Sequence, residues 1–487
     1  MSTLTAHLTR RRLAAIAVSA AAMALLAGVG PAAAQARSPA SFRGTASGGW
    51  GTAQPVPGLA ALNTGGLGQV NSVACTSAGN CTAVGEYATP TIIDLPFAAT
   101  QVNGTWHKAV KIPLAAAIKN SAIGLGGLAC PSPGNCTATG LLIGSGQQLV
   151  VVASEVNGTW RKVQELPGIA ALTNNRYHWS ESSGQACASA GNCAIGGVYN
   201  DASRHNRAFV ATEVNGTWHT AEQVPGTGGT GGNGAYVNTV SCVPAGPCTA
   251  GGGYPGGSPT GRAFAITDTG GTWGPLTAIP ASSSDAISSL SCPSAGNCSA
   301  GGPVTSDGLR PIGAFTTAEH HGTWSKPQPI PGLATLDTGG FATFTLACVS
   351  AGNCDGGGDY TDAAGHGQAY VVSQQHGIWG TAKAVPGLAT LNGGGSAQLY
   401  VLSCGTPNGC GAGGYYTDSA GHLQAFVVTA GNGVWGAAGQ VPGTATLNSG
   451  GFAITYAISC PAAGHCTAGG LYTTSTGNQQ AFVASQS

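Results

Sequence analysis

Short candidate strands alternate with turn-forming residues along most of the chain. One unit of this pattern occupies residues 399–442, and its candidate strands are 399–403, 411–416, 425–429 and 435–442. A polar turn at residues 417–422 separates the second strand from the third. Stretches of about five residues bounded by turns are typical of β-strands, and no part of the unit shows helical periodicity. The pattern therefore predicts four strands in each unit and no helices.

This unit occurs eight times. The cysteines form eight pairs, with five residues between the two members of each pair. From Cys75 to Cys460 there are 385 residues over seven steps, which gives a period of 55. A second marker, a Trp followed seven residues later by a Pro, also recurs eight times, starting with Trp50 and Pro57. The cysteine pairs are Cys75/Cys81, Cys130/Cys136, Cys187/Cys193, Cys242/Cys248, Cys292/Cys298, Cys348/Cys354, Cys404/Cys410 and Cys460/Cys466.

A four-stranded unit repeated every 40–55 residues is the signature of a β-propeller blade. A right-handed β-helix is the alternative, although its coils are about half as long. In seven units the second Cys precedes its Trp by 24 to 26 residues, so the eighth Trp would fall near position 491, but the chain ends at Ser487. Conversely, Trp50 has no Cys pair before it.

The N-terminal segment is therefore expected to supply the fourth strand of the C-terminal blade. The predicted fold is all-β: an eight-bladed β-propeller with four strands and one disulfide per blade, whose ring is closed by this N-terminal strand. Closure removes the edges that an open sheet would expose, and we expect a monomer.

The composition agrees with a folded protein. Gly accounts for 81 of the 487 residues, but it does not stand at every third position, so collagen is excluded. Disorder usually accompanies high net charge and few apolar residues, whereas here 42% of the residues are hydrophobic and the formal net charge is zero. The 17 basic and 17 acidic residues argue against a nucleic-acid partner, which would require a basic excess.

The first 36 residues have the pattern of an export signal. Arg10, Arg11 and Arg12 precede an apolar stretch at 13–29 and small residues at 32–36. An uncleaved membrane anchor is the alternative, and the route of export, general secretion or twin-arginine, stays open. The expected divisions are a signal peptide at 1–36, a short linker at 37–46 and the propeller at 47–487. Without the signal the chain has no candidate membrane span, so we expect it to be secreted or associated with the cell envelope.

Sixteen Cys residues behind an export signal indicate disulfides formed in an oxidising compartment. Each pair flanks a hairpin between the first and second strands, where facing residues lie about 4.5 Å apart and can be bridged. Zinc is the alternative, but its Cys pairs usually have two to four residues between them. Eight equivalent copies favour structural disulfides over a redox pair, and we expect neither a metal nor another cofactor.

Asn-Gly precedes Thr-Trp in three units, at 103–106, 157–160 and 215–218. Asn-Gly favours a type I′ hairpin turn, so these segments are expected to connect the third and fourth strands. They also match the N-glycosylation pattern, which stays an alternative. The Trp of each unit is expected to pack between blades, because a ligand-binding Trp would not need to occur in every blade.

Residues 268–273, Asp-Thr-Gly-Gly-Thr-Trp, resemble the Asp-box of sialidase-type propellers, which lies between the third and fourth strands of a blade. The box normally has Ser two residues before the Asp, where this chain has Ile266. Other units have Glu155, Glu213 or Glu319 at the Asp position. The resemblance implies relatives that use three Arg residues, a Tyr nucleophile with a Glu partner and an Asp acid, but no motif carries these roles onto residues of this chain.

The unit Ser-Cys-x-Ser-Ala-Gly-Asn-Cys is similar to that of repetitive exported bacterial propeller proteins. Its Ser-Ala-Gly-Asn part recurs at 77–80, 189–192, 294–297 and 350–353. This resemblance covers residues 47–487, and it implies a fold rather than an activity.

Departures from the repeat indicate candidate binding residues, because residues shared by all units belong to the scaffold. In a propeller the links between blades and the turns between strands two and three share one face, which usually binds ligands. The link into the third blade departs most, and the turn of that blade and the next two blades add Arg residues. The candidates are Arg176, Tyr177, His178, Trp179, Glu181, Arg204, His205, Arg207, Arg262 and Arg310.

In the functional interpretation, Tyr177 and Trp179 form a stacking platform, and the Arg residues hold an anionic group or a sugar hydroxyl. A solvated loop that drifted under weak selection is the alternative. The motifs Asp201-x3-His205, Asp362-x3-His366 and Asp418-x3-His422 also suggest a metal site. However, no third ligand is evident, and these residue types are common in turns.

Two functions are consistent with this pattern. The first is a secreted, non-catalytic propeller that binds a glycan or an extracellular protein on the face formed by links and turns. The alternative is a sialidase-like glycoside-processing enzyme, which would require Tyr177, Glu181 and the Arg residues to converge on one cavity. Most of the 17 carboxylates lie at turn or repeat positions, so the paired acids of a glycosidase are not obvious, which favours the binding protein.

Overall fold

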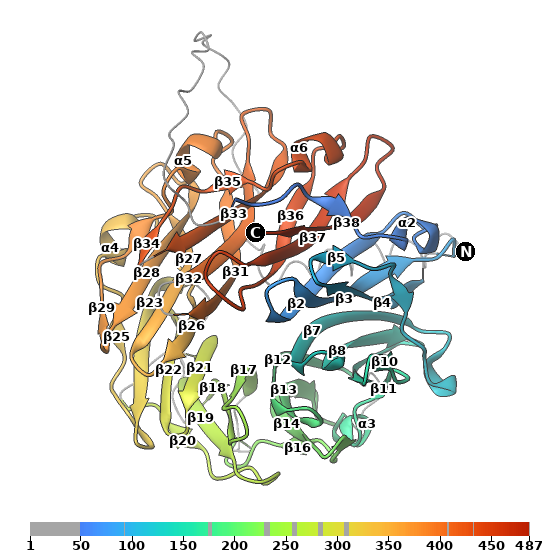
Figure 1. The fold of residues 1–487 in the computed structure, drawn as a ribbon. Helices are drawn as coiled ribbons and strands as arrows, with labels where there is room; N and C mark the ends of the chain where they lie inside the picture. Colours follow the sequence, from blue (N-terminus) through green and yellow to red (C-terminus); the bar gives the residue numbers. More distant parts are fainter. Residues whose placement is uncertain are drawn as a thin grey trace. The chain divides into compact units, whose positions relative to one another are not determined.

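The structure, a computed structural model, describes residues 49–486 except 92, 174–177, 228–233, 256–260, 281–285, 306–310, 407–408 and 432. Residues 46–487 form one compact unit that contains eight antiparallel sheets. The innermost strand of each sheet lies against the innermost strand of the next, and β2 (Gly68–Ser77) in turn contacts β36 (Ala453–Ser459), so the ring of sheets is closed (Figure 1). The predicted eight-bladed β-propeller is therefore confirmed.

The first four blades follow the chain in order. Blade 1 contains β2, β3 (Asn80–Ala88), β4 (Asp94–Val102), β5 (Thr105–Trp106) and β6 (Val110–Lys111). Blade 2 contains β7 (Ala122–Ser132), β8 (Asn135–Gly144), β9 (Gln147–Val156), β10 (Thr159–Trp160) and β11 (Gln164–Glu165). Blade 3 contains β12 (Ser180–Ser189), β13 (Asn192–Asn200), β14 (Asn206–Val214), β15 (Thr217–Trp218) and β16 (Glu222–Gln223). Blade 4 contains β17 (Tyr236–Cys242), β18 (Cys248–Tyr254), β19 (Arg262–Asp268) and β20 (Thr277–Ala278).

The last four blades complete the ring. Blade 5 contains β21 (Ser289–Ser294), β22 (Asn297–Thr305), β23 (Pro311–His320), β24 (Thr323–Trp324) and β25 (Gln328–Pro329). Blade 6 contains β26 (Thr345–Ser350), β27 (Asn353–Thr361), β28 (Gly367–Gln375), β29 (Ile378–Trp379) and β30 (Lys383–Ala384). Blade 7 contains β31 (Ala397–Thr406), β32 (Gly409–Thr417), β33 (Leu423–Gly431), β34 (Val434–Trp435) and β35 (Gly439–Gln440). Blade 8 contains β36, β37 (Thr467–Thr473), β38 (Gln479–Ser485) and β1 (Gln54–Pro55).

The outer strand of a blade is not one continuous strand of about five residues, as the sequence pattern suggested. In blade 1, β5 and β6 are separate two-residue pieces that both pair with β4. The break arises because a residue between the two pieces donates its N–H to the Pro carbonyl of the preceding link instead of to its own sheet. These bonds of 2.7–2.8 Å join adjacent blades at their outer rims, in the pairs Ala109/Pro57, Val163/Pro113, Ala221/Pro167, Ala382/Pro331, Ala438/Pro386 and Ala53/Pro442.

The links contain short helices that the sequence analysis did not predict. In α2 (Leu59–Leu62), Gly58 adopts a positive φ of 75°, which ends the extended chain and starts a single helical turn. The first residue, Leu59, is buried against the blade. The equivalent turns are η1 (Ala116–Ile118), α3 (Ile169–Leu172), α4 (Leu333–Leu336), α5 (Leu388–Leu391) and α6 (Thr444–Leu447).

A close approach of the two inner strands accounts for one Gly in every blade. A Cβ placed on Gly85 would lie 1.9 Å from the carbonyl oxygen of Gln69, and one on Gly414 would lie 1.9 Å from that of Gln398. Both Gly residues stand four positions after the second Cys of their blade, and the same position is Gly in all eight blades. Any side chain there would force the first two strands apart.

The predicted closure of the ring is observed. Strand β1 pairs with β38, where Gln54 faces Val483, and Trp50 forms a further bridge with Gln486. Trp50 is partly buried and packs against the cluster of Ile458 and the last disulfide. The N-terminal strand therefore completes the C-terminal blade.

All eight predicted disulfides are present, with Cα–Cα distances of 3.9–4.1 Å across facing positions of the two inner strands. The prediction of one disulfide per blade is therefore confirmed. The bridges join Cys75 to Cys81, Cys130 to Cys136, Cys187 to Cys193, Cys242 to Cys248, Cys292 to Cys298, Cys348 to Cys354, Cys404 to Cys410 and Cys460 to Cys466.

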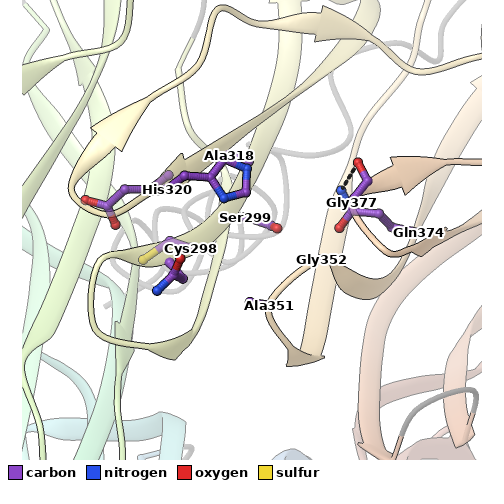
Figure 2. A pocket seen from close by; sticks show the side chains of 10 residues that line it. Cys298, Ser299, Ala318, His320, Ala351, Gly352, Gln374 and Gly377 are labelled. Carbon is purple, nitrogen blue, oxygen red and sulfur yellow. Dashed lines mark hydrogen bonds between the residues drawn. The ribbon is translucent and has the colours of Figure 1, made fainter.

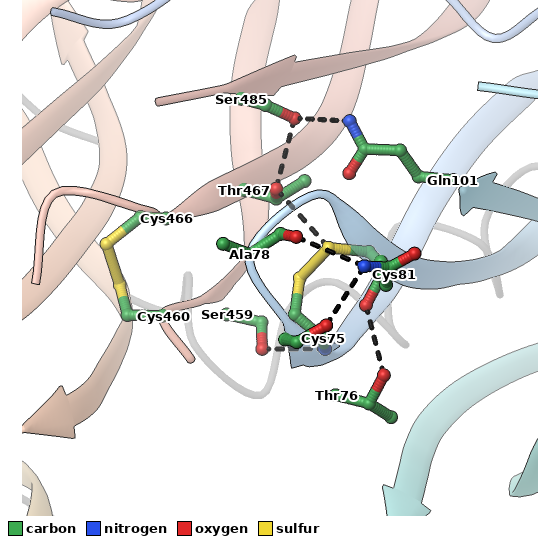
Figure 3. The surroundings of a disulfide bond; sticks show 12 residues. Cys75, Thr76, Ala78, Cys81, Gln101, Ser459, Cys460, Cys466, Thr467 and Ser485 are labelled. Carbon is green, nitrogen blue, oxygen red and sulfur yellow. Dashed lines mark hydrogen bonds between the residues drawn. A yellow bond between two sulfur atoms is a disulfide. The ribbon is translucent and has the colours of Figure 1, made fainter. Parts of the chain in front are cut away.

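The disulfides also make contacts between blades, which the sequence analysis did not predict. Figure 3 shows the first bridge, where blades 1 and 8 meet, and the Thr467 hydroxyl of blade 8 lies 3.5 Å from the sulfur of Cys81. The same contact recurs in other blades. The sulfur of Cys193 lies 3.3 Å from the Thr137 hydroxyl of blade 2, and that of Cys354 lies 3.4 Å from the Ser299 hydroxyl of blade 5. The second Cys therefore contacts the preceding blade as well as stapling its own, because it is buried where two blades meet.

The Trp and Asn-Gly predictions also hold. Asn103 and Gly104 both have positive φ, as a type I′ turn requires. Trp273 of blade 4 donates its indole N–H to the Thr212 hydroxyl of blade 3 at 3.0 Å, so this ring lies between blades. None of the helices in the described part of the chain has the length and apolar character needed to cross a bilayer.

Two faces of the propeller matter for function. The link face carries the inter-blade links and the turns between the second and third strands. A turn meets the next link where the N–H of Gly367 donates to the carbonyl oxygen of Gly395. The disulfide face carries the disulfide hairpins and the turns between the third and fourth strands. These two kinds of turn meet where the N–H of Gly104 donates to the carbonyl oxygen of Gly79. The grouping of links and turns expected from the sequence is therefore present.

Candidate functional site

Several of the sequence-predicted residues lie at one corner of blade 3 on the link face. The carbonyl oxygen of Trp179 accepts the N–H of Asn200, which begins the turn between β13 and β14. The carbonyl oxygen of His178 accepts the N–H of Gln148 in blade 2. The link into blade 3 therefore runs between the turns of blades 2 and 3. Three further candidates, Arg176, Tyr177 and Arg310, lie outside the described residues.

The turn of blade 3 is organised by Asp201. One carboxylate oxygen accepts the N–H groups of Ser203 and His205, both at 2.9 Å, and the other accepts Nε of Arg207 at 2.9 Å. Burial acts to raise the pKa of Asp201, but these hydrogen bonds hold the pKa below its usual value. The carboxylate thus fixes both the turn and the Arg207 side chain, which is 14% exposed.

The same arrangement explains the other two Asp-x3-His motifs. Asp362 accepts the N–H groups of Ala364 and His366, and Asp418 accepts those at the equivalent positions of blade 7. In each motif the His ring nitrogen lies 3.6 Å from the carboxylate. The Asp residues therefore have a structural role in three turns, which requires no metal.

The remaining sequence-predicted residues are more dispersed. Glu181 lies near the start of β12, where burial raises its pKa. Arg204 is exposed in the turn of blade 3 and has a positive φ of 65°. Arg262 is exposed at the start of β19 in blade 4, opposite Tyr254. The structure thus places Trp179, Arg204 and Arg207 on one blade and Arg262 on the next.

A second group, which the sequence analysis missed, lies at the link-face ends of the inner strands of blades 7 and 8. Tyr400 and Tyr456 each stand at a β-bulge of an innermost strand, where the extra residue redirects a side chain. Their rings stack, with centroids 5.9 Å apart and planes at 19°. The ring of Tyr415 lies 5.7 Å from that of Tyr400.

Two carboxylates extend this group into the flanking blades. Asp359 of blade 6 is buried, and its carboxylate accepts the N–H of Leu399 of blade 7 at 2.6 Å. Burial raises the pKa of Asp359 to about 7. Glu86 of blade 1 accepts a hydrogen bond from Gln69 at 2.9 Å. Burial, and to a smaller extent the charge of Glu86, raises the pKa of Tyr456 to about 12.

We call this group the tyrosine–carboxylate cluster; it consists of Glu86, Asp359, Tyr400, Tyr415 and Tyr456. Its members belong to four consecutive blades of the closed ring, 6, 7, 8 and 1. The cluster combines aromatic faces with carboxylate acceptors, and the amides of Gln69 and Gln398 lie directly across the strands from Glu86 and Tyr415. Such a combination can contact both the apolar face and the hydroxyl groups of a sugar.

Replacing Asp359 by Asn is expected to stabilise the protein above pH 7 and to change little near pH 4. With a pKa of about 7 against an ordinary value of 3.8, folded Asp359 keeps a proton that the unfolded chain releases. The free energy of unfolding therefore falls as the pH rises from about 4 to 7. The Asp359→Asn variant would remove that loss, while the amide oxygen of the new side chain still accepts the N–H of Leu399. Urea unfolding at several pH values measures the difference; parallel pH profiles for the two proteins would contradict it.

The comparison with known proteins shows no family for this chain. No protein-family model and no curated protein matches the sequence. Among solved structures, the Hadza microbial sialidase Hz136 is 13% identical with a TM-score of 0.36, and the match covers 65% of each chain, so this chain spans less than two thirds of that sialidase. The BP39L lectin from Burkholderia pseudomallei is 12% identical with a TM-score of 0.43, over 77% of this chain and 99% of the lectin.

A third similar structure is the β-propeller domain of the Trilobed protease from Pyrococcus furiosus. It is 6% identical with a TM-score of 0.41, over 75% of this chain and 97% of that domain. At these identities and TM-scores the three structures indicate no function for this chain. The function must therefore be argued from the residues of this chain.

Proposed function

We propose that the protein is an exported glycan-binding β-propeller whose site is the tyrosine–carboxylate cluster on the link face. The observation that carries this proposal is the stacked pair Tyr400 and Tyr456 at equivalent bulges of adjacent blades. Ligand sites combine aromatic side chains with a few convergent polar groups, and here Asp359, Glu86 and two Gln amides are those groups. Sugar C–H faces pack on the rings, and sugar hydroxyls donate to the carboxylates.

The charge of the cluster favours neutral glycans. Glu86 is an acid, and a negatively charged sugar would be repelled by its carboxylate at close range. The Arg residues that could hold an anion lie elsewhere, on blades 3 and 4, and the Nε of Arg207 donates to Asp201. A neutral oligosaccharide is therefore the ligand class that suits the cluster.

The hydrolase alternative is less well supported. That alternative requires Tyr177, Glu181 and the Arg residues to converge on one cavity, and Tyr177 lies outside the described residues. Within the tyrosine–carboxylate cluster, burial and the charge of Glu86 raise the pKa of Tyr456 to about 12, which does not suit a nucleophile that must lose its proton. Arg204, Arg207 and Arg262 stand on blades 3 and 4, and Tyr456 stands on blade 8. Binding without catalysis is the simpler function for this arrangement.

The proposal includes export. Residues 1–36 act as the signal peptide and 37–46 as a linker, and the mature protein is secreted or attached to the cell envelope. Eight disulfides within residues 75–466 suit an oxidising compartment, where a glycan ligand on a cell surface or in the medium is accessible.

Truncating either stacked ring is expected to weaken glycan binding at least about tenfold, which corresponds to ~1.4 kcal/mol. A library of neutral and sialylated oligosaccharides identifies the ligand, and calorimetry then compares wild type with Tyr400→Ala and Tyr456→Ala. The control is Val434→Ala, because Val434 is 70% exposed in a hairpin on the disulfide face. No bound neutral glycan, or equal affinity in the Tyr variants, would refute the proposed site.

A third variant separates the two candidate sites. Trp179→Ala changes the blade 3 corner without touching the tyrosine–carboxylate cluster. If Trp179→Ala loses affinity while both Tyr variants keep it, the glycan binds at the corner that the sequence indicated. Loss in the Tyr variants alone assigns the ligand to the cluster.

A further inference from the structure

One repeat position on the disulfide face is occupied by a buried polar side chain in seven blades. This residue faces the marker Trp across the hairpin between the third and fourth strands. Blade 7 has Ala430 instead. The seven side chains are 1–8% exposed, and they are Gln101, Glu155, Glu213, Asp268, Glu319, Gln374 and Gln486.

An amide at this position satisfies the hairpin turn. Gln101 donates its Nε2 to the carbonyl oxygen of Gly104 at 3.1 Å, and Gln374 donates to that of Gly377 at 3.2 Å, as Figure 2 shows for the second pair. A carboxylate at the same place has no proton to donate. A carboxylate oxygen beside the turn carbonyl is a second acceptor where the amide supplies a donor. The carboxylate therefore needs a hydrogen-bond donor or a cation from another part of the structure.

Glu213 has such partners. Glu213 accepts hydrogen bonds from the hydroxyls of Thr137 and Ser154, both at 3.1 Å. Burial raises its pKa, and the charge of Arg161 opposes that rise. Burial also raises the pKa of Asp268, and a hydrogen bond from the Gly271 N–H and the charge of His219 oppose that rise, but its Oδ1 atom has no hydrogen-bond partner among the described residues. The preceding blade therefore supplies partners for the Glu213 carboxylate, whereas Asp268 has only the Gly271 N–H and the charge of His219.

Glu155 has neither the hydroxyl partners of Glu213 nor the opposing charge found beside Asp268. It is 5% exposed, and its Oε2 atom has no hydrogen-bond partner among the described residues. Burial raises its pKa, and no neighbouring charge contributes in the opposite direction. A buried acceptor without a partner costs free energy, which calls for a donor or a cation that binds beside it.

Glu155 lines a cavity that is large enough for such a ligand. The cavity lies between blades 2 and 3, has a volume of about 330 Å³, and is also lined by Thr137, Ser154, Glu213 and Arg161. The equivalent cavity between blades 5 and 6 has a volume of about 20 Å³ and is lined by Glu319 and Gln374 (Figure 2). The same repeat position thus provides a large site with two carboxylates and a small site with one.

We propose that the cavity between blades 2 and 3 binds a calcium ion through the carboxylate of Glu155. Arg161 offsets the charge of Glu213, so Glu155 leaves one negative charge that is not compensated. The available ligands are carboxylate and hydroxyl oxygens, which hard cations prefer, and calcium accepts a flexible shell of six to eight oxygens that can include water. The site lies on the disulfide face and does not depend on the proposed glycan function.

The test compares two matched substitutions at one repeat position. Chelator-treated wild-type protein is expected to bind one calcium ion by calorimetry and to melt at a higher temperature with calcium than without. Glu155→Gln should weaken calcium binding at least tenfold, whereas Glu319→Gln should bind calcium as wild type does. Without calcium, Glu155→Gln should be at least as stable as wild type, because its amide can donate to the Gly158 carbonyl as in blades 1 and 6.

A spectroscopic measurement supports the assignment independently of that variant. Terbium in place of calcium should be sensitised by Trp160, which faces Glu155 across the hairpin, and the signal should disappear in Trp160→Phe and on addition of calcium. The proposal is overturned if wild type shows no calcium binding at millimolar concentration, if Glu155→Gln keeps its affinity, or if a small alkylammonium ion binds the cavity and calcium does not.

Discussion

Deletion of residues 37–58 is expected to convert a monomeric propeller into a destabilised or aggregated protein. The deletion removes β1, so β38 loses its partner strand and exposes a sheet edge. It also removes Val56, which is 3% exposed, and the Trp50 ring that packs on blade 8. Losing these two side chains costs about 3–5 kcal/mol, a large part of the ordinary stability of about 5–15 kcal/mol.

Size-exclusion chromatography with light scattering and thermal melting measure this effect. The matched control is deletion of residues 37–44, which leaves Trp50 and β1 in place and should change neither the oligomeric state nor the melting temperature. If both shortened chains remain monomeric and melt like the full chain, the ring does not depend on its N-terminal strand.

Much of the fold could be predicted because the eight copies of the unit can be compared with one another. The constant distance between Cys pairs gave the number of blades, and the missing Trp after Cys466 gave the closure by Trp50. Both inferences need only that identical units adopt identical structures. The disulfides followed for the same reason, since facing positions of a hairpin lie within bridging distance in every copy.

The features that were missed are either too short to leave a pattern in the sequence or depend on contacts between blades. The one-turn helix Leu59–Leu62 is too short for helical periodicity to appear in the sequence. The break in the outer strand arises because Ala109 donates to the Pro57 carbonyl of the preceding link. The contact of Cys193 with Thr137 of the preceding blade belongs to the same class. None of these can be derived from a single unit considered by itself.

The candidate site shows the same limit. The sequence analysis compared links and turns between units, which led to Trp179 and the Arg residues, but it did not compare positions within strands. Aligned on the first Cys, the fourth residue before it is Asn71, Gly126, Ser183, Asn238, Ser288, Phe344, Tyr400 and Tyr456. The two Tyr residues stand out in this comparison, yet their stacking follows from bulges in two neighbouring blades, which the sequence does not reveal.

The partners of individual side chains were equally hidden. Arg207 was predicted as a ligand-binding candidate, and the sequence did not show that its Nε donates to Asp201 of the same turn. Glu155 and Glu213 looked alike as residues at the Asp-box position, but only the structure distinguishes the carboxylate with two hydroxyl partners from the one with an unpartnered oxygen. The position in the repeat predicts that a side chain is buried. The neighbouring blade determines whether the polar atoms of that side chain have hydrogen-bond partners.

Reduction of the eight disulfides is expected to unfold the protein at ambient temperature. Each bridge closes a loop of about seven residues and stabilises the folded state by roughly 2 kcal/mol on the chain-entropy estimate. Eight such contributions together exceed the ordinary stability of about 5–15 kcal/mol, even if they are not fully additive. The second Cys of every pair is only 1–4% exposed, so reduction is made complete by unfolding the chain first.

The experiment therefore unfolds the protein in denaturant, reduces it and attempts refolding with the reductant present. Circular dichroism should then show no cooperative melting, whereas protein taken through the same cycle with its disulfides intact should recover its transition. A variant that lacks one bridge, Cys75→Ala with Cys81→Ala, should lose about 2 kcal/mol and remain folded. If the fully reduced chain refolds and melts within a few degrees of the oxidised protein, the contacts between blades alone hold the ring, and the disulfides do not determine its stability.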